Sequence, residues 1–199
     1  MKEYYADGKL RGEGSAIDGE LDGKTNRYYS NGNLKEYVYY RLGKKNGLSI
    51  KYYENGKLEE EGNYVNDIKD GFWKEYDEKG FGWEGNYVSV PDTENNIMSE
   101  KNGIWKFYDV SKDGTKYLSI KGKYVKGERE GEWNDYNKDG SKGDIKTYKN
   151  GKQVKHFKNG KHSLIEDMTI VGYEMWENDV LIETIRYEDE KEFYKKQKY

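Results

Sequence analysis

The sequence predicts an all-β protein in which tandem β-hairpins form an elongated, twisted, single-layer antiparallel sheet, followed by a short C-terminal helix. Three observations support this fold class. First, Gly8, Gly32, Gly56 and Gly80 are spaced 24 residues apart, and a fixed period of this size is typical of repeat architectures. Second, Asn-Gly and Asp-Gly pairs recur at turn positions. Third, the segments between these pairs are rich in tyrosine, valine and isoleucine, which favour strands.

Each unit contains an opening glycine, a tyrosine five residues later and a closing tyrosine. In the later units a tryptophan stands two residues after the opening glycine. Because these positions recur, we expect them to build the repeat. The expected structural residues are Gly23, Tyr28, Gly47, Tyr52, Gly71, Trp73, Tyr76, Gly103, Trp105, Tyr108, Gly131, Trp133 and Tyr136.

Each unit is expected to form one β-hairpin, because Asn-Gly and Asp-Gly dipeptides supply the positive φ angles that tight turns require. In the second strand of a unit, Gly62 shares a face with the closing Tyr64. A strand glycine on an aromatic face is explained if a ring from the adjacent strand lies across it. Trp73 and Tyr76 have opposite parity, so either the first strand carries aromatics on both faces or a bulge brings them together.

The domain organisation predicted is one array of about seven to eight units over residues 1–187 and a charged helix or tail at 188–199. The tail is acidic first and basic last, as the dipole of a short helix favours. An insertion loop is expected at 88–102, either as a tolerated surface insertion or as a binding loop. The array starts in the middle of a unit, which suggests that a leader or earlier repeats were removed.

Composition and charge exclude several classes. The chain has 35 basic and 38 acidic residues and a net charge of −3, whereas a nucleic-acid binder would show a basic excess. No stretch approaches the roughly 20 apolar residues of a transmembrane segment. The compartment stays open, either the bacterial cytoplasm or an exported location if a leader was removed.

Catalytic and metal-binding motifs are not found. The chain has no cysteine, and its two histidines are His156 and His162. His156 occupies a slot that is tyrosine in other units, and its spacing to His162 matches no common zinc pattern. We therefore predict that the protein is not an enzyme and has no catalytic residues, metal site or cofactor.

The motif Gly-x-Trp-x-x-Tyr occurs at Gly71–Tyr76, Gly103–Tyr108 and Gly131–Tyr136. Together with the turn glycines and the closing Gly-x-Tyr, it resembles the bacterial variant of MORN repeats (membrane occupation and recognition nexus), over roughly residues 1–160. The resemblance implies stacked β-hairpins in an extended, grooved sheet that serves as a scaffold or binding surface. Some bacterial members of this family are antitoxins or immunity proteins paired with secreted toxins. The membrane role in the name does not carry over, because no segment here is sufficiently basic or amphipathic.

Three function classes follow. The first is a non-enzymatic protein-binding scaffold, since repeat arrays expose large surfaces. The second is an antitoxin or immunity protein with one cognate toxin. The third is a cell-wall or glycan-binding repeat protein, although the Trp-Tyr-Tyr run of such repeats is absent. A protein partner is expected in the first two classes, and both end strands could also pair with a second copy to give an edge-to-edge homodimer.

The partner-binding candidates are aromatic residues that exceed the structural pattern, namely Tyr29, Tyr53 and Trp83. Tyr29 and Tyr53 each follow a pattern tyrosine and point to the opposite face of their strands. Trp83 takes the place that Glu60 holds in the preceding unit. Exposed aromatics are typical interface anchors. The alternative is that these side chains pack under their neighbours or form a second small core.

Overall fold

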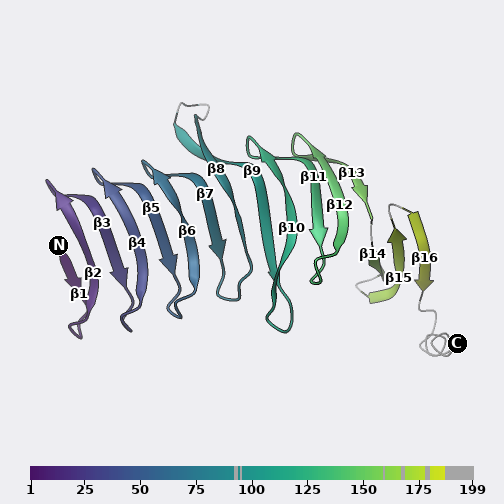
Figure 1. Ribbon diagram of the computed structural model, residues 1–199, viewed down its shortest axis with the longest axis horizontal. Helices are drawn as coiled ribbons and strands as arrows, with labels where there is room; N and C mark the ends of the chain where they lie inside the picture. Colours follow the sequence, from purple (N-terminus) through teal and green to yellow (C-terminus); the bar gives the residue numbers. More distant parts are fainter. Residues whose placement is uncertain (92–93, 95, 159, 167–168, 178–179, 187–199) are drawn as a thin grey trace.

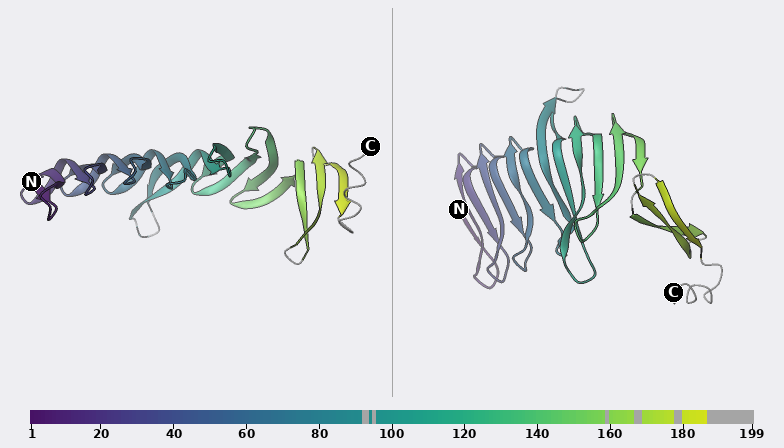
Figure 2. Two further views of the ribbon diagram at one scale, coloured as in Figure 1. Left: turned by 90° about the horizontal axis from the view of Figure 1, so that it is seen from below. Right: turned by 45° about the vertical axis from the view of Figure 1, so that its right-hand side comes forward.

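The chain is an open array of hairpins in one long antiparallel sheet (Figure 1). The structure, a computed structural model, describes residues 1–91, 94, 96–158, 160–166, 169–177 and 180–186. Strands β1 to β13 pair in sequence order, each with the strands before and after it. The sheet does not close on itself, and it is elongated along the direction in which hairpins are added (Figure 2). The all-β fold class is therefore confirmed.

The long sheet contains strands of three to fourteen residues. Their bounds are β1 (Lys2–Tyr4), β2 (Leu10–Ile17), β3 (Glu20–Tyr28), β4 (Leu34–Arg41), β5 (Lys44–Tyr52), β6 (Leu58–Val65), β7 (Ile68–Tyr76), β8 (Gly82–Pro91), β9 (Ile97–Val110), β10 (Lys116–Val125), β11 (Glu128–Tyr136), β12 (Lys142–Lys149) and β13 (Lys152–Phe157).

A second antiparallel sheet follows along the chain. It consists of β14 (Gly160–Glu166), β15 (Thr169–Glu177) and β16 (Val180–Arg186) in sequence order. The helix expected at 188–199 lies outside the described residues.

The hairpins end in two kinds of turn. At one end of the strands, the amide of Gly8 donates to the carbonyl of Tyr5 at 2.9 Å, and Gly8 has a φ of 81°. The equivalent glycines are those of the predicted Asn-Gly and Asp-Gly pairs. At the other end, Asp18 and Gly19 have φ of 50° and 86°, and Ile17 pairs with Glu20 across them. Two-residue turns with both central φ positive match the twist of the flanking strands.

The segment 88–102, expected as an insertion loop, largely lengthens the β8–β9 hairpin. Val88 pairs with Glu100 and Val90 pairs with Met98. The physical reason is local, because β-branched residues alternate here with small polar ones, a pattern that suits a strand. The extension projects beyond the neighbouring hairpins (Figure 1).

The first strand of a hairpin carries aromatics on both faces. Pairing between β7 and β8 runs without interruption from Gly71 to Tyr76, so Trp73 and Tyr76 point to opposite sides of the sheet. We call the side that carries Trp73 the tryptophan face and the other side the tyrosine face. On the tyrosine face the rings of Tyr76 and Tyr108 are 6.1 Å apart between centroids.

The core is thin. Among the described residues the fully buried large side chains are Val38, Trp73, Trp105 and Trp133. Partly buried Trp83, Tyr87, Phe107, Ile120 and Tyr148 pack against the cluster around Trp105 and Trp133. The sheet therefore buries large aromatic rings without a second layer, by covering each ring with neighbouring side chains.

Candidate functional site

The tryptophan face repeats one packing unit. The ring of Trp73 on β7 lies over Gly62 of β6, where a Cβ would come within 2.1 Å of the indole. The closing Tyr64 meets the same ring edge-on at a centroid distance of 4.9 Å. The ammonium of Lys69 stands 4.1 Å from the ring centroid, which is a cation–π distance.

The same unit recurs around the other two pattern tryptophans. The matching sets are Trp105 with Gly85, Tyr87 and Lys101, and Trp133 with Gly122, Tyr124 and Arg129. Burial of the Lys101 ammonium, with Arg129 nearby, lowers the pKa of Lys101. Sequence reasoning missed these cations, although each stands four residues before its tryptophan.

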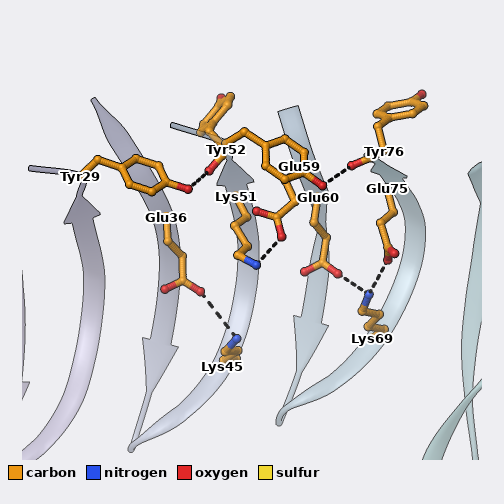
Figure 3. Close-up of polar contacts among 11 residues, drawn as sticks. Tyr29, Glu36, Lys45, Lys51, Tyr52, Glu59, Glu60, Lys69, Glu75 and Tyr76 are labelled. Atoms are coloured by element: carbon orange, nitrogen blue, oxygen red, sulfur yellow. Dashed lines mark hydrogen bonds and ion pairs between the residues drawn. The ribbon is translucent and has the colours of Figure 1, made fainter. Parts of the chain in front are cut away.

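The candidates Tyr29 and Tyr53 belong to a ladder that links successive units (Figure 3). The hydroxyl of Tyr29 donates to the carbonyl of Tyr52 at 2.8 Å, and the hydroxyl of Tyr53 donates to the carbonyl of Tyr76 at 2.9 Å. Tyr5 makes the equivalent bond to Tyr28 at 2.6 Å. Both candidate rings are half-buried, so each has a structural contact and also a surface accessible to a partner.

The third candidate, Trp83, is half-buried at the margin of the core. Its ring lies 4.9 Å from Trp105 between centroids. On β7 its partner is Glu75, and on β9 its partner is Phe107. On the tryptophan face, Trp83 therefore lies between a charged neighbour, Glu75, and an apolar neighbour, Phe107.

Trp83 and Tyr53 line one recess, whereas Tyr29 lies outside it. This acidic recess has a volume of about 390 Å³. Its carboxylates are Glu59, Glu60, Glu75 and Asp77, its cation is Lys51, and its rings include Tyr53, Phe81 and Trp83.

Lysines neutralise part of the acidic recess (Figure 3). Lys51 pairs with Glu59, and this hydrogen bond raises the pKa of Lys51. Lys69 is shared, with its Nζ 2.6 Å from Glu60 Oε2 and 3.8 Å from Glu75 Oε2. The carboxylates outnumber these lysines, so the recess keeps negative charge.

A second recess, of about 640 Å³, lies between the first hairpins. This basic recess is lined by Arg11, Arg27 and Lys35 with Glu3, and by the rings of Tyr4, Tyr5 and Tyr28. Five of its lining residues stand 48 residues before lining residues of the acidic recess, namely Glu3, Tyr5, Arg11, Arg27 and Tyr28.

The family comparison fits this geometry. The model of the MORN repeat variant matches residues 1–18, 21–41 and 45–66. Residues 1–66 are therefore similar to MORN repeats. The resemblance predicted from the sequence is confirmed over these residues, which span β1 to β6 and the basic recess. No curated protein matches the chain.

The tyrosine face carries an exposed apolar residue at one position of successive repeats, immediately after the opening glycine. This apolar row consists of Leu48, which belongs to the third MORN match, followed by Phe72 and Ile104 in the next hairpins. These residues are 38%, 45% and 48% exposed. The sequence signal for this row is the apolar residue that follows each of Gly47, Gly71 and Gly103.

Beyond the matched residues, β12 and β13 bring a histidine and a carboxylate together. His156 Nε2 lies 2.7 Å from Asp144 Oδ2, and the described residues contain no group of three or more potential metal ligands. Within the same residues there is also no helix with the length and apolarity to cross a membrane.

Proposed function

We propose that this chain is a non-enzymatic protein-binding scaffold whose repeat sheet presents a partner-binding surface. The observation that carries the proposal is the apolar row of Leu48, Phe72 and Ile104. These residues stay exposed on a sheet that buries Trp73, Trp105 and Trp133 completely. Exposed apolar side chains that gather on one surface mark interaction sites in soluble proteins.

The geometry of the apolar row suits a protein partner. Asn63 pairs with Leu48, and Asn86 pairs with Phe72, so amides able to form hydrogen bonds stand between the apolar residues. Hairpins follow one another at two strand spacings, about 10 Å, so the row spans a length that a protein surface can match at several points. Apolar anchors within a polar surround are characteristic of protein interfaces.

An antitoxin or immunity protein is the special case of this function with one cognate toxin. An antitoxin would differ from a general scaffold in having a single stoichiometric partner, whose toxic activity the chain inhibits. Glycan binding requires exposed rings on which a sugar can lie, and Trp73, Trp105 and Trp133 are buried. These three rings are therefore closed to a sugar, and glycan binding would fall to exposed rings such as Phe72 and Phe81.

The test is site-specific photo-crosslinking in the cells that make the protein, with a benzophenone amino acid at position 72 or 104. The matched control is the same amino acid at Leu42, which is 68% exposed in a tight turn away from the row. A discrete cross-linked protein from positions 72 and 104, absent from position 42, is expected. Equal cross-linking from all three positions, or none from positions 72 and 104, would contradict the proposal.

A further inference from the structure

The acidic and basic recesses are two copies of one structural feature with inverted charge. The Tyr5 hydroxyl bond to the Tyr28 carbonyl in the basic recess matches the Tyr53 bond to Tyr76 in the acidic one. Around this shared hydrogen bond, side chains at equivalent positions carry opposite charges in the two recesses. The corresponding pairs are Glu3 and Lys51, Arg11 and Glu59, and Arg27 and Glu75.

We propose that these recesses bind one extended protein segment that carries carboxylates at one end and guanidinium groups at the other. The carboxylates of the segment bind in the basic recess, next to Arg11 and Arg27. Its guanidinium groups bind in the acidic recess, next to Glu59 and Glu75. This inference rests on the proposed protein-binding function and specifies the chemistry of the partner.

The basic recess suits carboxylates because arginine guanidinium groups present paired donors that match a carboxylate. Arg27 is 60% exposed, although its Nη1 lies 3.5 Å from Glu36 Oε2. Arg11 is exposed and makes no ion pair with another described residue. Both guanidinium groups are therefore accessible to an added carboxylate.

The acidic recess suits a guanidinium for a different reason. Lys69 is shared between Glu60 and Glu75, so one cation serves two carboxylates. Trp83 stands opposite Glu75, where the equivalent partner of Arg27 is the carboxylate Glu36, and Phe81 is 40% exposed. A guanidinium can pair with carboxylates and stack on such rings at the same time.

The spacing sets the length of the segment. The recesses are lined by the turn residues Tyr5 in one case and Tyr53 and Phe81 in the other. These turns lie at the same end of the strands, the lower end in Figure 1, and the recesses are four strands apart. Four spacings of about 4.8 Å give roughly 19 Å, which an extended chain covers in about six residues.

The probes are fluorescent peptides whose binding is followed by anisotropy at low ionic strength. The bipolar peptide is Asp-Asp-Gly-Ser-Gly-Ser-Arg-Arg. Its controls carry aspartates at both ends, arginines at both ends, or both charge pairs without the spacer. Since each exposed ion pair adds a few-fold in affinity, we expect the wild-type chain to bind the bipolar peptide about tenfold more tightly than any control.

Charge reversal makes the test specific. The double variant Arg11→Glu with Arg27→Glu should bind the peptide with arginines at both ends most tightly. The double variant Glu59→Arg with Glu75→Arg should instead bind the peptide with aspartates at both ends most tightly. The milder pair Glu59→Gln and Glu75→Gln should abolish the preference for an arginine end. The matched control for the first pair is Lys24→Glu with Arg41→Glu, at exposed positions outside the recesses, and circular dichroism checks that each variant is folded.

The inference is overturned if wild-type protein does not prefer the bipolar peptide, or if the Lys24 and Arg41 control shifts the preference as much as reversal in the recess. Inorganic phosphate that competes as well as the full peptide would also overturn it, because it would indicate a simple anion site. The photo-crosslinks at positions 72 and 104 test the scaffold independently. If those crosslinks form and the peptide preference is absent, only the assignment of the recesses fails.

Discussion

The indole of Trp73 lies across the backbone of Gly62 in the neighbouring strand, so closely that a methyl group on Gly62 would stand 2.1 Å from Cδ2 of the ring. The same relation joins Trp105 to Gly85 at 2.3 Å and Trp133 to Gly122 at 2.1 Å. A glycine is needed because any side chain would occupy the volume of the ring. This relation explains how a single-layer sheet can bury an entire tryptophan.

We therefore expect Gly62→Ala to lower the free energy of unfolding by about 2–3 kcal/mol, since the added methyl overpacks a filled site. The control is Gly143→Ala, a strand glycine where a Cβ would have its nearest neighbour at 3.6 Å, and its effect should stay within about 0.5 kcal/mol. Urea unfolding of the two variants measures the difference. Similar values for both would show that the ring does not depend on the glycine.

Much of the fold could be predicted from the sequence. The 24-residue spacing from Gly8 to Gly32 fixes the hairpin repeat, and the shared parity of Gly62 and Tyr64 indicates that a ring lies across the glycine. Both inferences use local periodicity, which a strand converts directly into position. The extension of the β8–β9 hairpin was not predicted, because its residues lie outside the period.

The candidate surfaces were harder to predict. Tyr53 and Trp83 exceed the aromatic pattern of the repeats, and the structure places them in one recess. The change of charge between Arg11 and Glu59 can be interpreted only once both residues are known to line equivalent recesses. The equivalence of the two recesses depends on how side chains of neighbouring strands pack together, and this packing cannot be derived from the sequence alone.

One unit without the tryptophan, the one that opens at Gly47, uses a complementary pair. Val38 stands at the glycine position and Ser49 at the tryptophan position, and both are buried. Val38→Gly should open a cavity, and Ser49→Trp should overpack against Val38. The double variant should recover at least about 1 kcal/mol relative to the sum of the single effects, because it rebuilds the tryptophan-over-glycine unit.

A double-mutant cycle in urea measures this coupling. The control pairs Ser49→Trp with Val65→Gly, since Val65 is 45% exposed and cannot make room for the ring. Additive effects at positions 38 and 49 would refute the complementary exchange.

The tyrosine ladder gives a third prediction. Tyr53→Phe removes a hydroxyl that donates to the carbonyl of Tyr76 and should cost about 1 kcal/mol of stability. Tyr39→Phe is the control, because its exposed ring makes no hydrogen bond through its hydroxyl to the described residues. Thermal unfolding should separate the two variants, and equal melting temperatures would mean that the ladder adds nothing to stability.

The alkaline limb of the stability curve should depend on Tyr64. Burial of its ring, reinforced by Glu60 and other nearby carboxylates, raises the pKa of Tyr64 to about 12, whereas an unfolded tyrosine titrates near 10. The neutral phenol is therefore favoured in the folded state. Its contribution is fully present below about pH 10 and is lost as pH rises toward about 12. Urea unfolding at pH 8, 10, 11 and 12 should show a steeper fall for wild type than for Tyr64→Phe. Parallel curves for wild type and Tyr64→Phe would mean that this phenol does not ionise differently in the folded and unfolded chains.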